Sequence, residues 1–186
     1  DRLHALSRVV SRRGVPKAEK GTVIVHLRTG DVVEKDRRTV KDMLHGRIRL
    51  IDCPNMSPQI YVRPLSYHKQ LASIYKKRDA RRVVIVAGKH QSEVYTKSLE
   101  YINLVKQSWE QDGYTVTIRF GGDADTDFLY MCGGQFFVPS GGGFSHNIHR
   151  MRQILELNKD DIQYPGIEMA SQLKQWKELE LFLSKQ

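Results

Sequence analysis

The sequence has little of what marks several common protein classes. Its 186 residues include only two cysteines, Cys53 and Cys132, and neither belongs to a CxxC pair. This excludes a disulfide framework and a cysteine-based zinc site, and it suits a reducing compartment. No apolar run approaches the roughly 18 to 20 residues that a membrane-spanning helix needs. Apolar residues make up 40% and charged residues 27%, an ordinary globular composition that argues against wholesale disorder.

Short motifs of nucleotide-binding and hydrolytic enzymes are also missing. The sequence contains no P-loop, no G-x-G-x-x-G after its first strand and no G-x-S-x-G elbow. His146 and His149 lie three residues apart without a third ligand nearby, so no zinc site is expected. The acidic run that begins at Asp123 fails the EF-hand pattern, because Phe128 stands where that pattern requires glycine.

Positive charge is in excess, with 30 Lys and Arg residues against 21 Asp and Glu residues and a net charge of +9. Three stretches hold the excess, and each has four more basic than acidic side chains: residues 1–20, 35–49 and 76–82. They are either solvated helix ends and loops or a surface that attracts nucleotide phosphates, nucleic acid or an acidic membrane surface. No nucleic acid is expected as a partner, because aromatic residues do not alternate with the basic ones.

Strands and helices are expected to alternate along one domain over residues 1–186, with an N-terminal helix within residues 1–20 and a C-terminal helix within residues 166–186. The predicted strands are Gly21–Arg28, Ile48–Ile51, Gln59–Val62, Arg82–Ala87, Tyr114–Phe120 and Gln135–Val138. The predicted helices between them are Asp36–Leu44, Leu65–Lys77, Ser92–Gln111, Thr126–Met131 and Phe144–Leu157. The residues expected on inward helix faces include Leu3, Leu6, Val9, Val10, Val94, Leu99, Ile102, Val105 and Trp109.

The main strands are unbroken apolar runs rather than alternating ones. This pattern indicates a mainly parallel sheet covered on both faces, which is a doubly wound α/β domain. Ligands of such sheets bind beyond the carboxyl ends of the strands. The residues that follow each strand are therefore the candidates for function.

The first of these strand ends reads HLRTGD, from His26 to Asp31. His26 and Arg28 share one face of the strand, and Arg28 is placed to donate two hydrogen bonds to a phosphate. Gly30 allows a close approach of the backbone. Asp31 is either a general base or the partner of Arg28, and a plain ion pair at the strand end is the alternative interpretation.

Two further strand ends carry polar residues and glycine. The acidic run before the helix Thr126–Met131 either contacts a ligand or caps that helix, with Asp125 or Thr126 as the N-cap. The segment Pro139–Gly143 contributes no side-chain packing at its glycines. It is either a flexible turn or an anion site, because its N–H groups are exposed at the start of a helix.

The first and third strand ends together resemble the fucosyltransferase superfamily, whose members have a GT-B-like architecture and use GDP-fucose. The family's H-x-R-x-x-[DN] motif corresponds to His26–Asp31. Its later acidic loop, short helix, strand and serine-rich loop correspond to Asp125–Met131, Gln135–Val138 and Pro139–Ser145. The resemblance covers roughly Thr22 to Arg152. Three glycines replace the serines usual in the family, and family members are longer. The chain therefore resembles either the donor-binding half of a GT-B enzyme or a minimal enzyme.

The resemblance implies a Rossmann-like, metal-independent glycosyltransferase with GDP-fucose as its donor and a glycan or protein as its acceptor. Arg28 would bind the β-phosphate, with His26 lining the pocket, while Asp31 and then Glu34 are the candidate bases. The residues implied in donor binding are Gly30, Asp125, Asp127, Ser140, Gly141, Gly142, Gly143, Phe144 and Ser145.

Two other functions stay open at this point. One is a non-catalytic module that binds a nucleotide or glycan, and the other is a basic protein that binds nucleic acid or a membrane surface. The location is open between the cytoplasm and the Golgi lumen, where an anchor would have been removed.

Overall fold

The computed structural model describes residues 2–45, 61–90, 92–140, 142–159 and 161. Four parallel strands form one sheet in the order β3-β2-β1-β4. In chain order they are β1 (Thr22–Leu27), β2 (Arg82–Ala87), β3 (Thr115–Phe120) and β4 (Phe136–Val138). All four were predicted. The strands β1, β2 and β4 are apolar runs that are buried almost throughout, because a strand buried on both faces needs no polar alternation. The outer strand β3 alternates polar and apolar residues and is partly exposed.

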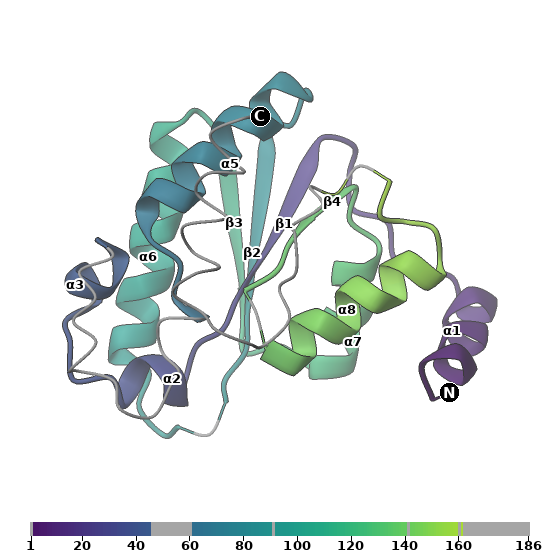
Figure 1. Cartoon of the computed structure of the whole chain (residues 1–186), viewed down its shortest axis with the longest axis horizontal. Coiled ribbons are helices and arrows are strands. Elements are labelled where there is room, and N and C mark those ends of the chain that lie inside the picture. Colours follow the sequence, from purple (N-terminus) through teal and green to yellow (C-terminus); the bar gives the residue numbers. More distant parts are fainter. Residues whose placement is uncertain (1, 46–60, 91, 141, 160, 162–186) are drawn as a thin grey trace, which may run out of the picture.

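Helices cover both faces of the sheet (Figure 1). On one face lie α5 (Leu65–Lys77) and α6 (Thr96–Gln111), and on the other lie α7 (Ala124–Cys132) and α8 (Gly142–Ile154). Two short helices, α2 (Asp31–Glu34) and α3 (Val40–Leu44), follow β1, and α1 (Arg2–Arg13) precedes it. The molecule is therefore a doubly wound, Rossmann-like α/β fold.

The sheet divides the hydrophobic core into two clusters. Val23, Val25 and Leu27 of β1 face the larger cluster with α5 and α6, whereas Ile24 faces the smaller one with α7 and α8. Every residue of β1 is buried. Because burying one such aliphatic side chain contributes about 1.5–3 kcal/mol, β1 is a principal anchor of the fold. His26 is a buried polar residue within this strand, and it shares the face of Ile24.

The strand order creates a topological switch point between β1 and β4. From β1 the chain adds β2 and β3 outward on one side, with α5 and α6 as the crossover helices on one face. It then passes α7 on the opposite face and places β4 on the other side of β1. In open α/β sheets this is where ligands bind, beyond the carboxyl ends of the two strands.

Several sequence-based boundaries and core positions were wrong. Leu6, Val94 and Leu99 are exposed rather than inward-facing. Val94 precedes α6, which begins at Thr96 rather than Ser92 because the chain first makes a bend through residues 93–94. Leu99 occupies the outer side of α6, whose inward side uses Ser98, Tyr101 and Ile102 instead.

The ends of other elements also differ from the prediction. The N-terminal helix within residues 1–20 ends at Arg13, where Gly14 adopts a φ of 76° and Pro16 follows. The helix α8 begins two residues early, at Gly142, and ends at Ile154. Tyr61 and Val62 are not in a strand. The strand predicted at 48–51, the helix predicted within 166–186, and residues 59 and 60 lie outside the described residues.

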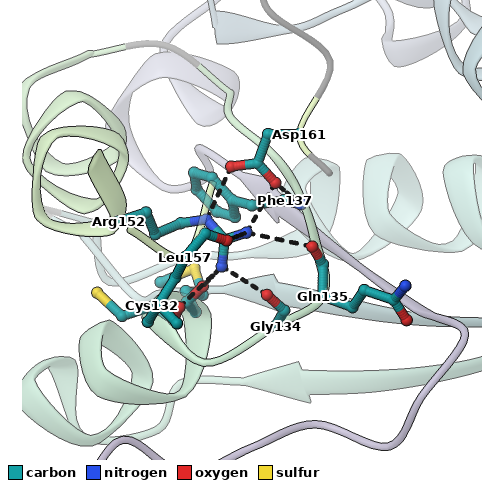
Figure 2. A network of polar contacts seen from close by, with 8 residues as sticks. Cys132, Gly134, Gln135, Phe137, Arg152, Leu157 and Asp161 are labelled. Carbon is teal, nitrogen blue, oxygen red and sulfur yellow. Dashed lines mark hydrogen bonds and ion pairs between the residues drawn. The ribbon is translucent and has the colours of Figure 1, made fainter. Parts of the chain in front are cut away.

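A buried ion pair closes the amino-terminal end of β4 (Figure 2). Arg152 of α8 is fully buried, and its Nε and Nη2 lie 2.8 and 2.7 Å from the two carboxylate oxygens of Asp161. Its Nη1 donates to the carbonyls of Cys132 at 2.7 Å and Gly134 at 2.6 Å. The last carbonyls of a helix lack intrahelical partners, so Arg152 supplies donors that the end of α7 needs.

The same guanidinium also reaches beyond α8, because Nη2 donates to the carbonyl of Leu157 at 2.8 Å. Asp161 in turn accepts the backbone N–H of Phe137 in β4 at 2.9 Å. Burial raises the pKa of the Asp161 carboxyl, an effect that the Arg152 guanidinium and the Phe137 N–H oppose. We call Arg152 and Asp161 the amino-edge clamp, since they join α7, β4 and α8 at the edge opposite the switch point.

Candidate functional site

The loop after β1 is held tightly against the end of β2. Gly30 has φ 76° and ψ −129°, a conformation that is essentially restricted to glycine. Its N–H donates to the hydroxyl of Ser98 at 3.1 Å, and a Cβ at this position would collide with the backbone of His90. Thr29 donates its hydroxyl to the carbonyl of Gly88 at 2.6 Å. The close approach predicted for Gly30 exists, and its partner is another loop of the protein.

Arg28 lies at the mouth of the switch point with an incomplete set of partners. Its Nη2 is 3.1 Å from a carboxylate oxygen of Asp31, and its Cζ lies 5.8 Å from the ring centroid of Tyr61. Its Nε is buried and has no hydrogen-bond partner among the described residues. A buried donor left unpaired costs about 1–3 kcal/mol, so the site favours an acceptor that arrives from outside.

His26 joins β1 to the segment after β4. Its Nδ1 lies 2.5 Å from the hydroxyl of Ser145 and 3.1 Å from the hydroxyl of Ser140. The backbone N–H of Ser140 also donates to the Ser145 oxygen at 3.2 Å. With the imidazole proton on Nε2, Nδ1 accepts from the serine hydroxyls, and with the proton on Nδ1 it donates to them. We call His26, Ser140 and Ser145 the switch-point junction, because they connect the strands on either side of the switch point.

The histidine of this junction is neutral at pH 7. Burial lowers the pKa of His26 to about 4, and the positive charge of Arg28 acts in the same direction. A neutral imidazole has one nitrogen that accepts a hydrogen bond, whereas both nitrogens of an imidazolium donate. Protonation of His26 would therefore fix Nδ1 as a donor, and the hydroxyl oxygens of Ser140 and Ser145 would have to accept from it.

The segment at the start of α8 was the predicted anion site, and its residues have different surroundings in the structure. Ser140 and Ser145 are buried and point into the junction, and the Ser140 N–H is already engaged by Ser145. A Cβ added to Gly143 would meet no atom within 4 Å. Phe144 is 36% exposed, and its ring lies 5.6 Å from that of His26 in an edge-to-face arrangement. Gly141 lies outside the described residues.

The two carboxylates predicted as bases have different surroundings. Asp31 begins α2 and forms the ion pair with Arg28, which was the alternative interpretation of this motif. Glu34 turns away to the first turn of α6, where its oxygens accept the N–H of Ser98 at 2.7 Å and of Lys97 at 3.3 Å. It satisfies two donors that the start of a helix leaves without intrahelical partners.

The acidic loop after β3 caps α7, as one of the two interpretations held, but the N-cap is Asp123 rather than Asp125 or Thr126. Its carboxylate accepts the N–H and the hydroxyl of Thr126, both at 2.8 Å. These bonds lower the pKa of Asp123. Asp127 is buried and pairs with Arg119 of β3 at 3.0 Å, whereas Asp125 is exposed in the first turn of α7.

Tyr61 is a site residue that the sequence did not indicate. It follows residues outside the described part of the chain, and its ring contacts both Arg28 and the first residue of α8. Gly142 has a φ of 78°, and a Cβ there would lie 2.9 Å from Cε1 of Tyr61. No local motif surrounds Tyr61, so only the three-dimensional arrangement brings it to the switch point.

Comparisons with known proteins bear on the fold alone. No family model and no curated protein sequence matches the chain. It is similar to the solved structure of POFUT1 in complex with GDP, with 16% identity, a TM-score of 0.43, and 82% of this chain and 44% of that chain covered. For POFUT1 in complex with GDP-fucose the identity is 15% and the TM-score 0.43, with 82% and 42% covered. The chain thus spans less than half of the length of the POFUT1 chains.

The described part of the chain contains neither a cluster of metal ligands nor a membrane-spanning helix. Among the described residues, no group of three or more His, Cys, Asp and Glu side chains is arranged to hold a metal ion. None of the described helices combines the length and the apolar character required to cross a membrane. Cys132 is buried, and burial raises the pKa of its thiol to about 12.

Proposed function

We propose that the chain binds a nucleoside diphosphate sugar at the switch point and forms the donor-binding part of a glycosyltransferase. The observation that carries this proposal is the buried Nε of Arg28, which has no hydrogen-bond partner in the described part of the chain and lies where open α/β sheets bind their ligands. A phosphate oxygen satisfies such a donor and matches the charge of the guanidinium. The resemblance of the His26–Asp31 motif to the fucosyltransferase superfamily names GDP-fucose as the first donor to test.

The diphosphate would lie between Arg28 and the first turn of α8. A helix of 13 residues presents unpaired N–H groups at its start, together with the positive end of its dipole. Gly143 leaves its amide without a shielding side chain. Arg28 and these amides would approach the same diphosphate from β1 and from α8, the two sides of the switch point.

The chemistry expected from this arrangement is electrostatic. When the bond between the sugar and the β-phosphate breaks, negative charge builds up on the leaving diphosphate. Arg28 and the α8 amides would bind that charge more strongly in the transition state than in the ground state, which lowers the barrier. The switch-point junction would keep β1 and α8 in register, because neutral His26 bonds to serines on either end of the loop.

Proton transfer from the acceptor hydroxyl needs a base, and Asp31 is the better placed of the two candidates. It lies beside Arg28 at the strand end, whereas Glu34 is engaged by the amides of α6. The acceptor itself is a glycan or protein hydroxyl in this proposal. We further propose that transfer needs no metal, so activity with GDP-fucose should persist in excess EDTA.

A panel of ligands tests the proposed function. Wild-type protein is heated with GDP, UDP, CDP and the corresponding nucleotide sugars, and its unfolding temperature is recorded. A ligand at 100 times its Kd stabilises the folded state by about 2.7 kcal/mol, which raises the unfolding temperature by several degrees. Absence of a shift with every nucleotide would contradict the proposal.

A second experiment separates an enzyme from a non-catalytic nucleotide-binding module. Slow hydrolysis of the bound nucleotide sugar, lost in Arg28→Ala, supports a transferase because the same charge stabilisation acts with water as the acceptor. Tight binding without any turnover, either with water or with candidate acceptors, would support the binding module instead.

The basic stretch 76–82 supports a further interaction. It lies at the amino edge of the sheet, away from the switch point, and includes the exposed side chains of Lys76, Arg81 and Arg82. We infer that this surface contacts acidic membrane lipids, since each nearby Lys or Arg contributes about 1 kcal/mol. Sedimentation with phosphatidylserine vesicles at low and high salt tests it; equal sedimentation with neutral vesicles, or preferential binding to single-stranded DNA, would contradict it.

A further inference from the structure

The ring of Tyr61 lies beside both halves of the switch point. From the β1 side, the guanidinium carbon of Arg28 lies over the ring at 5.8 Å from its centroid. From the α8 side, Gly142 approaches the ring edge so closely that a Cβ there would lie 2.9 Å from Cε1. The ring also packs against the larger core cluster, which fixes it from behind.

The ring gives Arg28 a second restraint besides Asp31. The carboxylate holds Nη2 at 3.1 Å, while the ring faces the guanidinium carbon. Attraction between a guanidinium and an aromatic face acts within about 6 Å of the centroid, so this contact lies near the outer end of that range. Besides these two restraints, the guanidinium has a buried Nε for which residues 2–45, 61–90, 92–140, 142–159 and 161 supply no hydrogen-bond partner.

We propose that Tyr61 is a positioning residue for diphosphate recognition, which holds the Arg28 guanidinium in front of the first turn of α8. The proposal rests on the proposed function. A side chain that is already fixed loses less conformational freedom when the ligand binds, so a positioned Arg28 binds phosphate more tightly than a mobile one. Gly142 belongs to the same arrangement, because both its φ of 78° and the nearby ring require a residue without a side chain.

The test compares Tyr61→Leu with Tyr61→Phe in calorimetric titrations with GDP. Leucine fills part of the volume without an aromatic face, whereas phenylalanine keeps the face and loses only the hydroxyl. We expect Tyr61→Leu to weaken GDP binding by about fivefold to thirtyfold, the range of a cation–π contact. Tyr61→Phe should stay within about twofold of wild type, and equal losses in the two variants would overturn the proposal.

A double-mutant cycle with Arg28→Ala separates positioning from general damage to the structure. If Tyr61 acts through Arg28, Tyr61→Leu changes GDP affinity by less than about twofold when Arg28 is already absent. The same fold-loss in both backgrounds would overturn the proposal, because a structural role does not depend on Arg28. Failure of the wild-type protein to bind any nucleotide would instead contradict the proposed function itself.

Tyr130→Leu is the matched control. Arg119 lies 4.3 Å from the Tyr130 ring centroid, so this variant removes a shorter contact of the same kind on the other face of the sheet. We expect GDP affinity within about twofold of wild type. A loss as large as that of Tyr61→Leu would overturn the proposal, since removal of any such contact would then have the same effect.

Discussion

Two arginines occupy opposite edges of the same sheet, and their partners differ in kind. Arg152, at the amino edge, is fully buried, and all three of its guanidinium nitrogens bond to the carboxylate of Asp161 or to backbone carbonyls. Among the residues that the structure describes, Arg28 at the carboxyl edge pairs with the carboxylate of Asp31 and the ring of Tyr61, and its buried Nε has no hydrogen-bond partner. A buried polar network stabilises a fold when all of its members are satisfied. An arginine at a strand end that still has a hydrogen-bond donor to offer is suited to bind a ligand.

The largest expected effect is the loss of stability when the amino-edge clamp is broken. Asp161→Ala leaves the Arg152 charge buried without its counter-ion, which should lower the free energy of unfolding by about 3–5 kcal/mol. Urea denaturation measures it, and Asp161→Asn should lose less because it keeps an acceptor. Asp79→Asn removes the exposed pair with Arg81 and should change stability by less than about 0.5 kcal/mol. Equal losses in the Asp161 and Asp79 variants would show that the clamp is no more important than a surface pair.

The next effect is expected at the switch point, in affinity rather than stability. If Arg28 binds the diphosphate as proposed, Arg28→Ala removes its charge-assisted hydrogen bonds, and GDP affinity should fall about a hundredfold. Stability should change by less than about 1 kcal/mol, because Arg28 is 26% exposed and its pairing with Asp31 is only partly shielded. Calorimetric titration measures the affinity, with Arg82→Ala at the amino edge as the control. If both variants bind GDP like the wild type, the site lies elsewhere.

Acid should lower the free energy of unfolding, because His26 of the switch-point junction is neutral in the folded protein. The pKa of His26 is about 4 in the folded protein and about 6.5 when unfolded. Above pH 6.5 both states are neutral, and between pH 6.5 and 4 only the unfolded state takes up the proton. Stability is therefore complete above pH 6.5 and falls by about 2–3 kcal/mol toward pH 4. His26→Gln should show a shallower slope of unfolding free energy against pH, and an unchanged slope would contradict a buried neutral histidine.

The smallest effect concerns the acidic loop. Asp123→Ala removes the N-cap of α7 and should cost about 1 kcal/mol of unfolding free energy. Asp123→Asn, which keeps a capping oxygen, should recover most of that loss in the same urea denaturation. Failure of the asparagine variant to recover stability would show that the charge matters more than the capping bond.

The strands were predictable because a parallel sheet needs unbroken apolar runs, such as the one that forms β1. Predictions failed where local pattern and packing diverge. The Leu99 position fits a helical stripe, yet α6 turns Ser98 inward, because its hydroxyl accepts the N–H of Gly30. The clamp was not foreseen either, since Arg152 and Asp161 form no motif and meet only after α8 has folded onto β4.

The sequence was enough to predict which strand ends carry the site residues, but it was not enough to predict the partners of those residues. Arg28 and His26 follow from their place in β1, because strand alternation puts them on one face at the carboxyl edge. The bonds from His26 to Ser140 and Ser145 join residues more than a hundred positions apart. The contact between Tyr61 and Arg28 was not predictable either, because no sequence pattern relates the two residues.

The central claim is that a diphosphate binds at Arg28 and the start of α8, and the most direct test is a GDP titration followed by ¹⁵N NMR. Arginine Nε–H groups give resolvable signals, so Arg28 and Arg152 can be compared in one sample. The account predicts that the largest shifts occur at Arg28 Nε–H and at the amides of Gly142 and Gly143, with little change at Arg152. Shifts confined to Arg152, or to the basic stretch 76–82, would contradict it.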